Sequence, residues 1–498
     1  MVLLPSACDH FGLTLGIGIA GALALLALWP RSPSHIKLTE KPYRKIHNLD
    51  GTQPIVGDLP EYARNAERFH DWLNENCLRV NNEPWRMRIV GQNNVLVFSS
   101  PDAFEDILVT QFDNFPRGEY LNSMLEGVFG RAIITLDGEQ WYRQRKAAAK
   151  FFTAKALRVC MLHTMHKNVL QMYKALDKSM RDSKPINFTN LLHQFTLHTF
   201  AEIGLGEFYW KLERFLNYGP ERELARVMND VRAWFGGIID QSLRSARERV
   251  ERREASNAVD DENAIKSVVE LFVESSQSDL EGLRAEDLVD FLLTFVLAAQ
   301  DTSALTLAWF FYAINKYPVV EKRIRDEMEE ILPGLGIKND TYLTTEHISK
   351  LVYFEATMRE TLRLYTTVPL MQKVAEKDTV VCGDIPVRAG ESVILSMYAM
   401  ARNPHVWGPD AGEFKPDRWI DQANGELLSF PATKFAAFSA GPRICIGMKL
   451  GMLEIRVVAA NLMRRYKLEL QPPSDGSYLV GITLSHKQPL HMKVTHSA

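Results

Sequence analysis

The segment from Asp287 to Tyr317 places the strongest constraint on how this chain can fold. It is apolar on nearly all sides and carries helical periodicity. At about 1.5 Å per residue, about 30 helical residues span about 45 Å, enough to cross a domain. The sequence therefore predicts a helix through the centre of one large, mainly helical (α+β) domain. Strand-like alternation is confined to short pieces, such as Trp85 to Phe98 and Asp378 to Met397, which predict small sheets.

Two polar residues, Asp301 and Thr302, lie near the middle of this apolar helix. A carboxylate and a hydroxyl at that depth cost free energy unless they have partners or a function. In one interpretation Thr302 donates to a carbonyl of its own helix and Asp301 meets a buried partner. In the other, the pair transfers protons, because proton delivery needs a positioned acid and a short relay.

A second constraint comes from Cys445, in the stretch F-S-A-G-P-R-I-C-I-G-M. Gly441 and Gly447 flank the cysteine and allow backbone N–H groups to approach its sulfur. The periodicity from Met448 to Tyr466 predicts a helix, so Cys445 precedes a helix N-terminus that favours the thiolate. Arg443 adds a cation nearby. Such a thiolate suits a nucleophile or a metal ligand, and the alternative is a buried structural cysteine.

The spacing F-x-x-G-x-R-x-C-x-G, formed by Phe438, Gly441, Arg443, Cys445 and Gly447, resembles the haem-ligand loop of the cytochrome P-450 monooxygenases. The resemblance implies the cytochrome P-450 fold and a haem b group held non-covalently apart from its iron, with Cys445 as the axial thiolate. A thiolate ligand favours O–O bond cleavage.

Two other positions resemble contacts to the haem propionates. Trp141 and Arg145 form W-x-x-x-R on one face of a predicted helix, as in the family helix that binds a propionate. On spacing alone they are an ordinary surface pair. Lys373 stands where many family members have an Arg or His that touches a propionate.

The segment A-A-Q-D-T-S resembles the acid–alcohol pair of the family, which implies that Asp301 and Thr302 deliver protons during oxygen activation. The family usually has glycine where Ala299 stands, and a basic residue is more usual than Gln300. One fatty-acid-hydroxylating group carries a glutamate esterified to haem where this chain has Ala298, so this chain cannot form that ester there.

Glu360 and Arg363 lie three residues apart in M-R-E-T-L-R-L-Y, which resembles the E-x-x-R helix of the family. Arg418 lies in the downstream segment W-G-P-D-A-G-E-F-K-P-D-R-W. The resemblance implies that these three residues form a buried triad that holds the cysteine loop. The alternative is an exposed ion pair, which would contribute little to stability.

Three segments, D-N-F-P-R-G, G-E-Q-W-Y-R-Q-R-K and Y-A-M-A-R-N-P-H-V-W-G-P-D-A, look most like fatty-acid ω-hydroxylases and alkane hydroxylases of plants and yeasts. This implies insertion of one oxygen atom from O₂ into a lipophilic substrate, most of all ω-hydroxylation of a fatty acid. Alternatives are hydroxylation of a sterol or other lipid, a thiolate-haem sensor or electron-transfer protein, and peroxide rearrangement. We expect an apolar pocket, although ordinary core packing explains its residues equally well. Its predicted lining is Leu121, Met124, Leu125, Phe295, Ala298, Val368, Leu370 and Ile482.

The N-terminal segment from Phe11 to Trp29 is apolar, uncharged and barely long enough to cross a bilayer. Basic residues follow it, which predicts a single-pass anchor in the endoplasmic reticulum membrane with the catalytic domain on the cytosolic face. A cleaved signal peptide is the alternative. The glycines of G-x-G-x-x-G lie inside this span, so they predict no nucleotide site. The predicted units are an anchor (1–30), a basic, proline-containing linker (31–60) and a haem-thiolate catalytic domain (61–498).

Composition limits the partners. A net charge of -3 over 498 residues gives no indication of nucleic-acid binding. Five cysteines without a C-x-x-C pair favour a reducing compartment over a disulfide framework. Only residues 450–498 follow the cysteine loop, so we expect a separate NADPH-dependent flavoprotein reductase to supply electrons.

Overall fold

The structure is a computed structural model that describes residues 43–205 apart from 92 and 154, then 285–337 and 341–497, with a few isolated positions between 236 and 248. The predicted anchor, residues 1–30, lies outside the described residues. Within them, one helical stretch, Val289–Lys316, is long and apolar enough to cross a membrane, and most of it is buried inside the protein.

Helices form most of the described chain, as predicted. After residue 115, the described helices of at least eleven residues are α5 (Glu119–Phe129), α6 (Gly138–Thr153), α7 (Lys155–Arg181), α8 (Phe188–Leu205), α12 (Ala285–Lys316), α13 (Pro318–Gly334), α15 (Val352–Leu364) and α18 (Met448–Arg465). The others are α2 (Leu59–Arg64), α3 (Phe69–Arg79), α4 (Pro101–Glu105), α14 (Thr345–Ile348), α16 (Met397–Ala401) and α17 (Pro404–Trp407).

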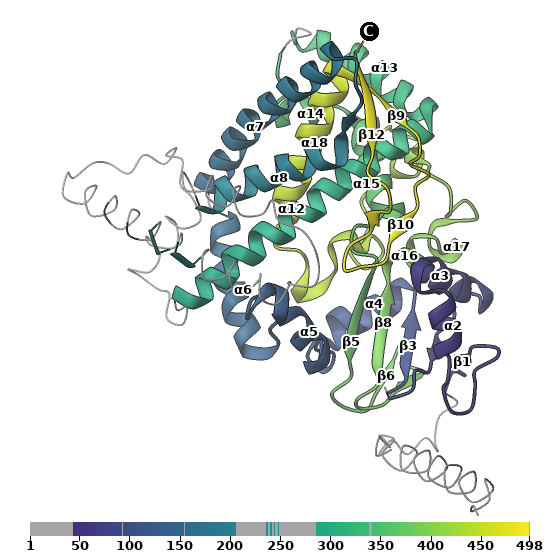
Figure 1. Ribbon diagram of the computed structural model, residues 1–498. Helices are drawn as coiled ribbons and strands as arrows, with labels where there is room; N and C mark the ends of the chain where they lie inside the picture. The colour runs from purple at the N-terminus through teal and green to yellow at the C-terminus, as the bar shows by residue number, and fades with distance from the viewer. Residues whose placement is uncertain are drawn as a thin grey trace, which may run out of the picture.

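The strands form small sheets. The largest has the order β1-β2-β3-β8-β5, from β1 (His47–Asn48), β2 (Trp85–Met87), β3 (Val95–Phe98), β8 (Ser392–Ser396) and β5 (Leu370–Val374). A second has the order β4-β12-β9, from β4 (Ile186–Asn187), β12 (His491–His496) and β9 (Tyr466–Gln471). Two further antiparallel pairs are β6 (Thr379–Val381) with β7 (Ile385–Val387), and β10 (Tyr478–Leu479) with β11 (Ser485–His486). In Figure 1 the largest sheet lies below the helices, beside α2 and α3.

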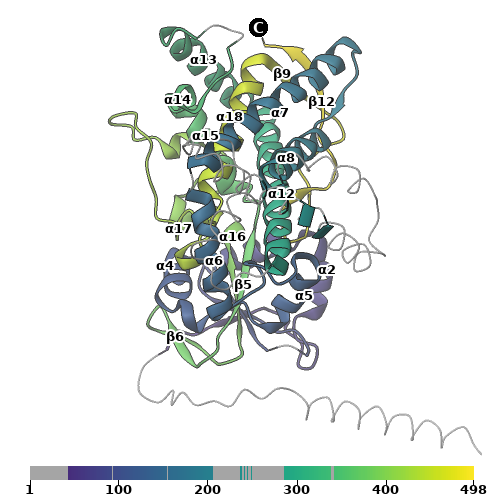
Figure 2. The ribbon, with the colours of Figure 1, turned by 90° about the vertical axis from the view of Figure 1, so that its left-hand side faces the viewer.

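Helix α12 forms the centre of the helical part, which confirms the helix predicted from Asp287 to Tyr317. Its C-terminal half is buried on all sides, with Trp309, Phe310 and Phe311 each at most 1% exposed. It packs along α8 and also contacts α15 and α18. Figure 2 shows α12 running lengthwise from the sheet region into the helical part. This apolar sequence is therefore a core helix, since apolar neighbours cover every side of its C-terminal half.

The predicted strand regions are each divided by turns. Trp85 to Phe98 forms β2 and β3, with Gly91 at φ 79° between them. Asp378 to Met397 forms β6, β7 and β8, with Gly383 at φ 77° and Gly390 at φ 81° at the two turns. Glycine adopts positive φ without a steric cost, so these positions interrupt the alternation that the sequence suggested.

The predicted boundary at residue 61 is corrected by the structure. β1 pairs with β2 and Leu49 is buried, so this part of the predicted linker belongs to the domain. Asp58 is 1% exposed, and its carboxylate accepts hydrogen bonds from the Arg88 backbone N–H at 2.7 Å and the Thr52 hydroxyl at 2.6 Å. These contacts fix the chain from β1 to the start of α2.

Candidate functional site

The cysteine loop lies between two short helical turns and the start of α18. The turns cover Ala436–Phe438 and Gly441–Arg443. The Cys445 backbone N–H donates to the Phe438 carbonyl at 2.8 Å. Gly441 has φ +66°, and a Cβ there would lie 2.0 Å from the Leu108 carbonyl oxygen, so only glycine fits. Contacts at Gly441 and Cys445 thus fix the loop conformation after Phe438.

Cys445 is exposed, yet enough protein surrounds its sulfur for burial to raise the pKa of the thiol. Hydrogen bonds from the Gly447 and Met448 backbone N–H groups, and the charge of Arg145, act in the opposite direction. The prediction that the helix N-terminus and Arg443 favour the thiolate is corrected for the protein by itself, because burial outweighs the backbone donors and the cation that acts on the sulfur is Arg145. A coordinated metal cation would stabilise a thiolate in such a place.

Helix α6 brings Trp141 and Arg145 to the cysteine loop. The Arg145 Nη2 atom donates to the Ile444 carbonyl at 2.6 Å, one residue before Cys445. Trp141 is buried, and the Arg443 guanidinium lies over its ring at 4.5 Å. The two residues therefore face the loop from one side of the helix, as their spacing of four predicts.

Arg443 does not turn toward Cys445 as a simple neighbouring cation. Its Nη2 atom donates to Asp137 Oδ1 at 2.6 Å and to the Leu136 carbonyl at 2.8 Å. Asp137 also accepts the backbone N–H of Arg117 at 3.2 Å and the Asn122 side chain at 2.7 Å. Asp137 thus joins the loop to the segment just before α5.

Lys373 on β5, which is buried, joins the half-buried Arg117 and Arg443 in a cluster of three cations around this carboxylate. Its Nζ atom, like Nε and Nη1 of Arg443, is buried with no hydrogen-bond partner in the described residues. Burial, together with the Arg443 and Arg117 charges, lowers the pKa of Lys373 to about 7, against an opposing effect of Asp137. Burial and the charge of Arg117 lower the pKa of Arg443 to about 10. Three cations facing one carboxylate with unused donors fit a bound group that carries carboxylates.

Asp301 and Thr302 on α12 are each bound to a different partner. The Thr302 hydroxyl donates to the Ala298 carbonyl of its own helix at 2.8 Å. The Asp301 carboxylate instead accepts the Thr483 hydroxyl at 2.6 Å. The first interpretation of these residues, with a back-bonded hydroxyl and a partnered acid, therefore describes this conformation. It does not exclude proton transfer, because both hydroxyls can rotate.

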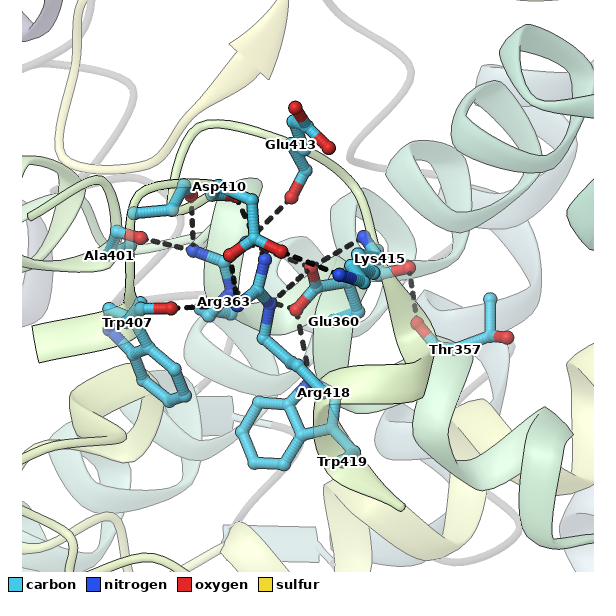
Figure 3. Close-up of polar contacts among 12 residues, drawn as sticks. Thr357, Glu360, Arg363, Ala401, Trp407, Asp410, Glu413, Lys415, Arg418 and Trp419 are labelled. Atoms are coloured by element: carbon cyan, nitrogen blue, oxygen red, sulfur yellow. Dashed lines mark hydrogen bonds and ion pairs between the residues drawn. The ribbon is translucent and has the colours of Figure 1, made fainter. Parts of the chain in front are cut away.

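Glu360, Arg363 and Arg418 form one buried network, shown in Figure 3. Arg363 donates to both carboxylate oxygens of Glu360 at 2.7 and 2.8 Å, and Arg418 donates to one of them at 3.1 Å. The Trp419 indole N–H donates to the same carboxylate at 2.9 Å. The side chain of Glu360 is 0% exposed, so this is not the surface pair considered above.

The remaining donors of the two arginines bind backbone carbonyls. Arg363 donates to the Ala401, Ala411 and Glu413 carbonyls, and Arg418 to those of Trp407 and Asp410. The network therefore ties α15 to the segment from α16 to Trp419, which leads into the cysteine loop (Figure 3). Every charge in it has a partner, which a buried ion pair requires.

The predicted pocket residues come from four places: α5, α12, the start of β5 and the turn between β10 and β11. Phe295 is buried, and the centroid of its ring lies 5.6 Å from the ring centroids of Phe152 and of Phe200. Met124 is 58% exposed and Ile482 is 55% exposed. Ala298 is exposed, and the others are half-buried: Leu121, Leu125, Val368 and Leu370.

Two cavities, of about 550 and 740 Å³, open elsewhere, between α7 and the C-terminal end of α18. They share Tyr173 and Arg465 in their linings. Cys445 precedes the opposite end of α18, so these cavities do not belong to the site built around the cysteine.

The sequence matches the family model described as "Cytochrome P450" over residues 50–221 and 207–481. The chain belongs to the cytochrome P450 family. It is 29% identical over 445 residues to cytochrome P450 monooxygenase cyp1 of Mycosarcoma maydis, which covers 81% of this chain and 69% of that protein. It is 28% identical over 495 residues to cytochrome P450 704C1 of Pinus taeda, covering 89% and 92%. It is also 28% identical over 464 residues to cytochrome P450 86B1 of Arabidopsis thaliana, covering 84% and 80%.

Membership confirms that the protein is a monooxygenase, an oxidoreductase that uses haem b with iron bound to a cysteine thiolate. P450 enzymes act on lipophilic substrates with O₂ and a redox partner. The residues around Cys445 fit this cofactor, because the cluster of Lys373, Arg443 and Arg117 has unused donors suited to the haem carboxylates.

Sequence reasoning missed two residues of the site, Arg117 and Asp137, and the hydrogen bond that Thr483 donates to Asp301. Arg117 and Asp137 lie within or beside segments that were used only for their likeness to hydroxylases. Arg117 and Asp137 could have been noticed as a cation and an acid close in sequence to the W-x-x-x-R helix. No sequence spacing indicates that they lie near Lys373 in the fold. Thr483 lies 182 residues from Asp301 in sequence, so only the fold brings it there.

Proposed function

We propose that this P450 hydroxylates a fatty acid, most of all at its ω end, with Cys445 as the ligand of the haem iron. The observation that supports the iron site is the cysteine loop itself, whose backbone holds the exposed Cys445 sulfur beside α6. When bound, the haem supplies oxygen activation. The chain supplies the ligand, the propionate contacts and the proton donors.

The propionate contacts would come from the buried cations. Lys373 and Arg443 have donors without partners, and Arg117 adds charge to the same cluster. Trp141 packs against Arg443, and Arg145 holds the Ile444 carbonyl, so both stabilise the loop around the ligand. Phe438 and Gly441 set the backbone that positions Cys445, and Gly447 donates an N–H to its sulfur.

Asp301 and Thr302 would hold and move the protons that oxygen activation consumes. The Thr302 hydroxyl donates to the Ala298 carbonyl and could turn to another acceptor, because a hydroxyl rotates freely. The Thr302→Ala variant should keep haem but consume NADPH with less product and more peroxide. A fully coupled variant would contradict this role.

The proposal of a fatty-acid substrate is supported by the likeness of three segments to fatty-acid ω-hydroxylases. It is also supported by apolar side chains that are exposed to solvent. Met124 and Ile482 are large apolar residues left more than half exposed, on two elements that face the α12 region. Such surfaces mark places where a lipophilic ligand or another apolar partner packs. A membrane anchor in residues 1–30, in the endoplasmic reticulum membrane, would bring the enzyme close to such substrates, and a separate NADPH-dependent flavoprotein reductase would donate electrons.

The test is a panel of fatty acids of graded chain length, alkanes and sterols, added to the purified haem protein. Binding next to the iron is measured by the change in haem spin state, and products are identified after turnover with a P450 reductase. We expect fatty acids to give the largest spin shift and terminally hydroxylated products. A response confined to sterols would overturn the substrate while leaving the monooxygenase assignment intact.

A further inference from the structure

Asp301 is held by a residue that lies outside the acid–alcohol segment. The Thr483 hydroxyl donates to Asp301 Oδ2 at 2.6 Å, a short bond of the kind that charged acceptors form. Thr483 belongs to the turn between β10 and β11, near the C-terminal end of the chain. Thr302, the neighbour of Asp301, binds the Ala298 carbonyl instead. The acid is therefore oriented by the hairpin turn and not by the alcohol beside it.

Helix α8 holds the opposite side of this part of α12. The Thr196 hydroxyl donates to the Gln300 carbonyl at 2.8 Å, directly before Asp301 in the chain. His193 lies almost one turn earlier on α8. Burial lowers the pKa of His193, and the Asp301 charge partly offsets this effect, which places the imidazole within electrostatic reach of the carboxylate. Asp301 thus accepts a hydroxyl from the hairpin, and its charge acts on an imidazole of α8.

The hairpin turn has firm anchors on the side that follows Thr483. The Leu484 backbone N–H donates to the Thr367 carbonyl at 2.8 Å, and its own carbonyl accepts the Trp309 indole N–H at 2.7 Å. On the other side, the Tyr478 hydroxyl donates to Asp71 at 2.9 Å. These bonds fix where Thr483 lies relative to α12, while Ile482 beside it stays exposed. The turn can therefore position an acid and still present an apolar side chain.

We infer that Thr483 is a positioning residue for the catalytic acid: its hydroxyl sets the orientation from which the Asp301 carboxyl passes protons toward Thr302. This rests on the proposed role of Asp301 in proton delivery. Without the hydroxyl, the carboxylate would lose this orientation and would deliver protons to Thr302 more slowly. Reduction of O₂ by two electrons from NADPH, with two protons, would then end more often in the release of H₂O₂.

The first test uses the holoenzyme with reductase, NADPH and palmitate as the probe. The Thr483→Val variant, which keeps the shape of the side chain, should release several-fold more peroxide per NADPH than the wild-type protein. The Thr483→Ser variant, which keeps the hydroxyl, should restore wild-type coupling. Leu479→Ala, at a half-exposed residue of the same hairpin, serves as the control and should leave the peroxide yield at the wild-type level.

A second test does not depend on turnover. The Tm is measured for the wild-type holoenzyme, Thr483→Val, Asp301→Asn and the double variant. If the two side chains act through their hydrogen bond, the double variant should lose less than the sum of the single losses. Additive losses, or unchanged peroxide release by Thr483→Val, would overturn the inference. A wild-type enzyme that does not oxidise palmitate would instead count against the proposed substrate, since the Tm cycle would still show the pairing.

Discussion

Lys373 is the single side chain whose surroundings argue most directly for a bound anion. An ammonium that is 3% exposed, with no hydrogen-bond partner in the described part of the chain and two arginine charges acting on it, is unfavourable in the protein alone. A carboxylate placed among these cations would give each of them a partner. The unfavourable position thus makes sense if the site exists to hold the haem propionates.

Replacing Lys373 by methionine should therefore have opposite effects on the apoprotein and the holoenzyme. Without haem, Lys373→Met should raise the Tm, because a poorly partnered buried charge is removed. With haem, the variant should lose the cofactor about tenfold faster, since a charge-assisted hydrogen bond contributes about 1.5–3 kcal/mol. Transfer of haem to apomyoglobin measures the loss. Lys377→Met, at an exposed lysine nearby, serves as the control, and equal effects of the two substitutions would contradict the assignment.

Glu454 is a second buried ionisable residue, on the face of α18 turned toward Ser303 of α12. Burial raises its pKa from 4.5 to about 8, against a smaller opposing effect of the Ser303 hydroxyl. The folded protein then holds a proton that the unfolded chain releases, between pH 4.5 and about 8. Stability from this group is present below pH 4.5 and is lost as the pH rises through about 8.

The Glu454→Gln variant should accordingly gain stability relative to the wild-type protein as the pH rises. We expect similar Tm values at acidic pH and a higher Tm for the variant at alkaline pH. The difference in Tm between the two proteins, measured from acidic to alkaline pH, reports the titration of Glu454 separately from that of the other groups. Glu330→Gln, at an exposed acid on α13, should show no such trend. A pH-independent difference for Glu454→Gln would show that the carboxyl is already ionised.

The sequence singled out residues with a fixed backbone or charge requirement, although Gly441 makes a different contact from the predicted approach of N–H groups to the sulfur. Gly441 is needed because its Cβ would meet the Leu108 carbonyl, and Glu360 is needed because two arginines converge on it. The pairing of Asp301 with Thr483 was not predictable, because a hydroxyl on a distant turn leaves no periodic signal.

At the scale of elements, the network around Glu360 makes α15 and the segment before the cysteine loop one unit. Glu360→Gln would leave Arg363 and Arg418 buried with too little negative charge. Breaking a buried pair in this way costs about 3–5 kcal/mol. Denaturant unfolding of the holoenzyme measures the change in the free energy of unfolding.

Asp326→Asn provides the matched control for that experiment. Asp326 pairs with Lys322 at 2.7 Å on α13, but both side chains are more than half exposed. An exposed pair of this kind contributes about 0–1 kcal/mol. If Glu360→Gln cost no more than Asp326→Asn, the network would not hold the two elements together.

Helices and strands differed in how far the sequence predicted them. The bounds of α12 and α18 follow the predicted segments closely, since an apolar pattern of helical period continues over many residues. The two predicted strand regions contain turns at positive-φ glycines that the alternation did not indicate. Alternation over a few residues does not mark where a strand ends, and the pairing partners of β3 and β8 lie almost 300 residues apart.

At the scale of the whole molecule, the fold brings together residues that the sequence could only associate by likeness to a family. Lys373 on β5, Trp141 on α6 and Arg443 in the cysteine loop meet around Asp137. The family and its cofactor were predictable because several motifs occur in order along the chain. The lining of the substrate pocket was not, because Phe295 and Val368 pack equally well as core residues.

The assignment of Cys445 as the iron ligand is the claim on which the proposed chemistry depends. The direct measurement is the absorption spectrum of the reduced holoprotein after addition of carbon monoxide. The wild-type protein and the Cys382→Ala control should show the Soret band of thiolate-ligated haem, and Cys445→Ala should lack it. A spectrum of histidine-ligated haem in the wild-type protein, or an unchanged spectrum in Cys445→Ala, would contradict the assignment.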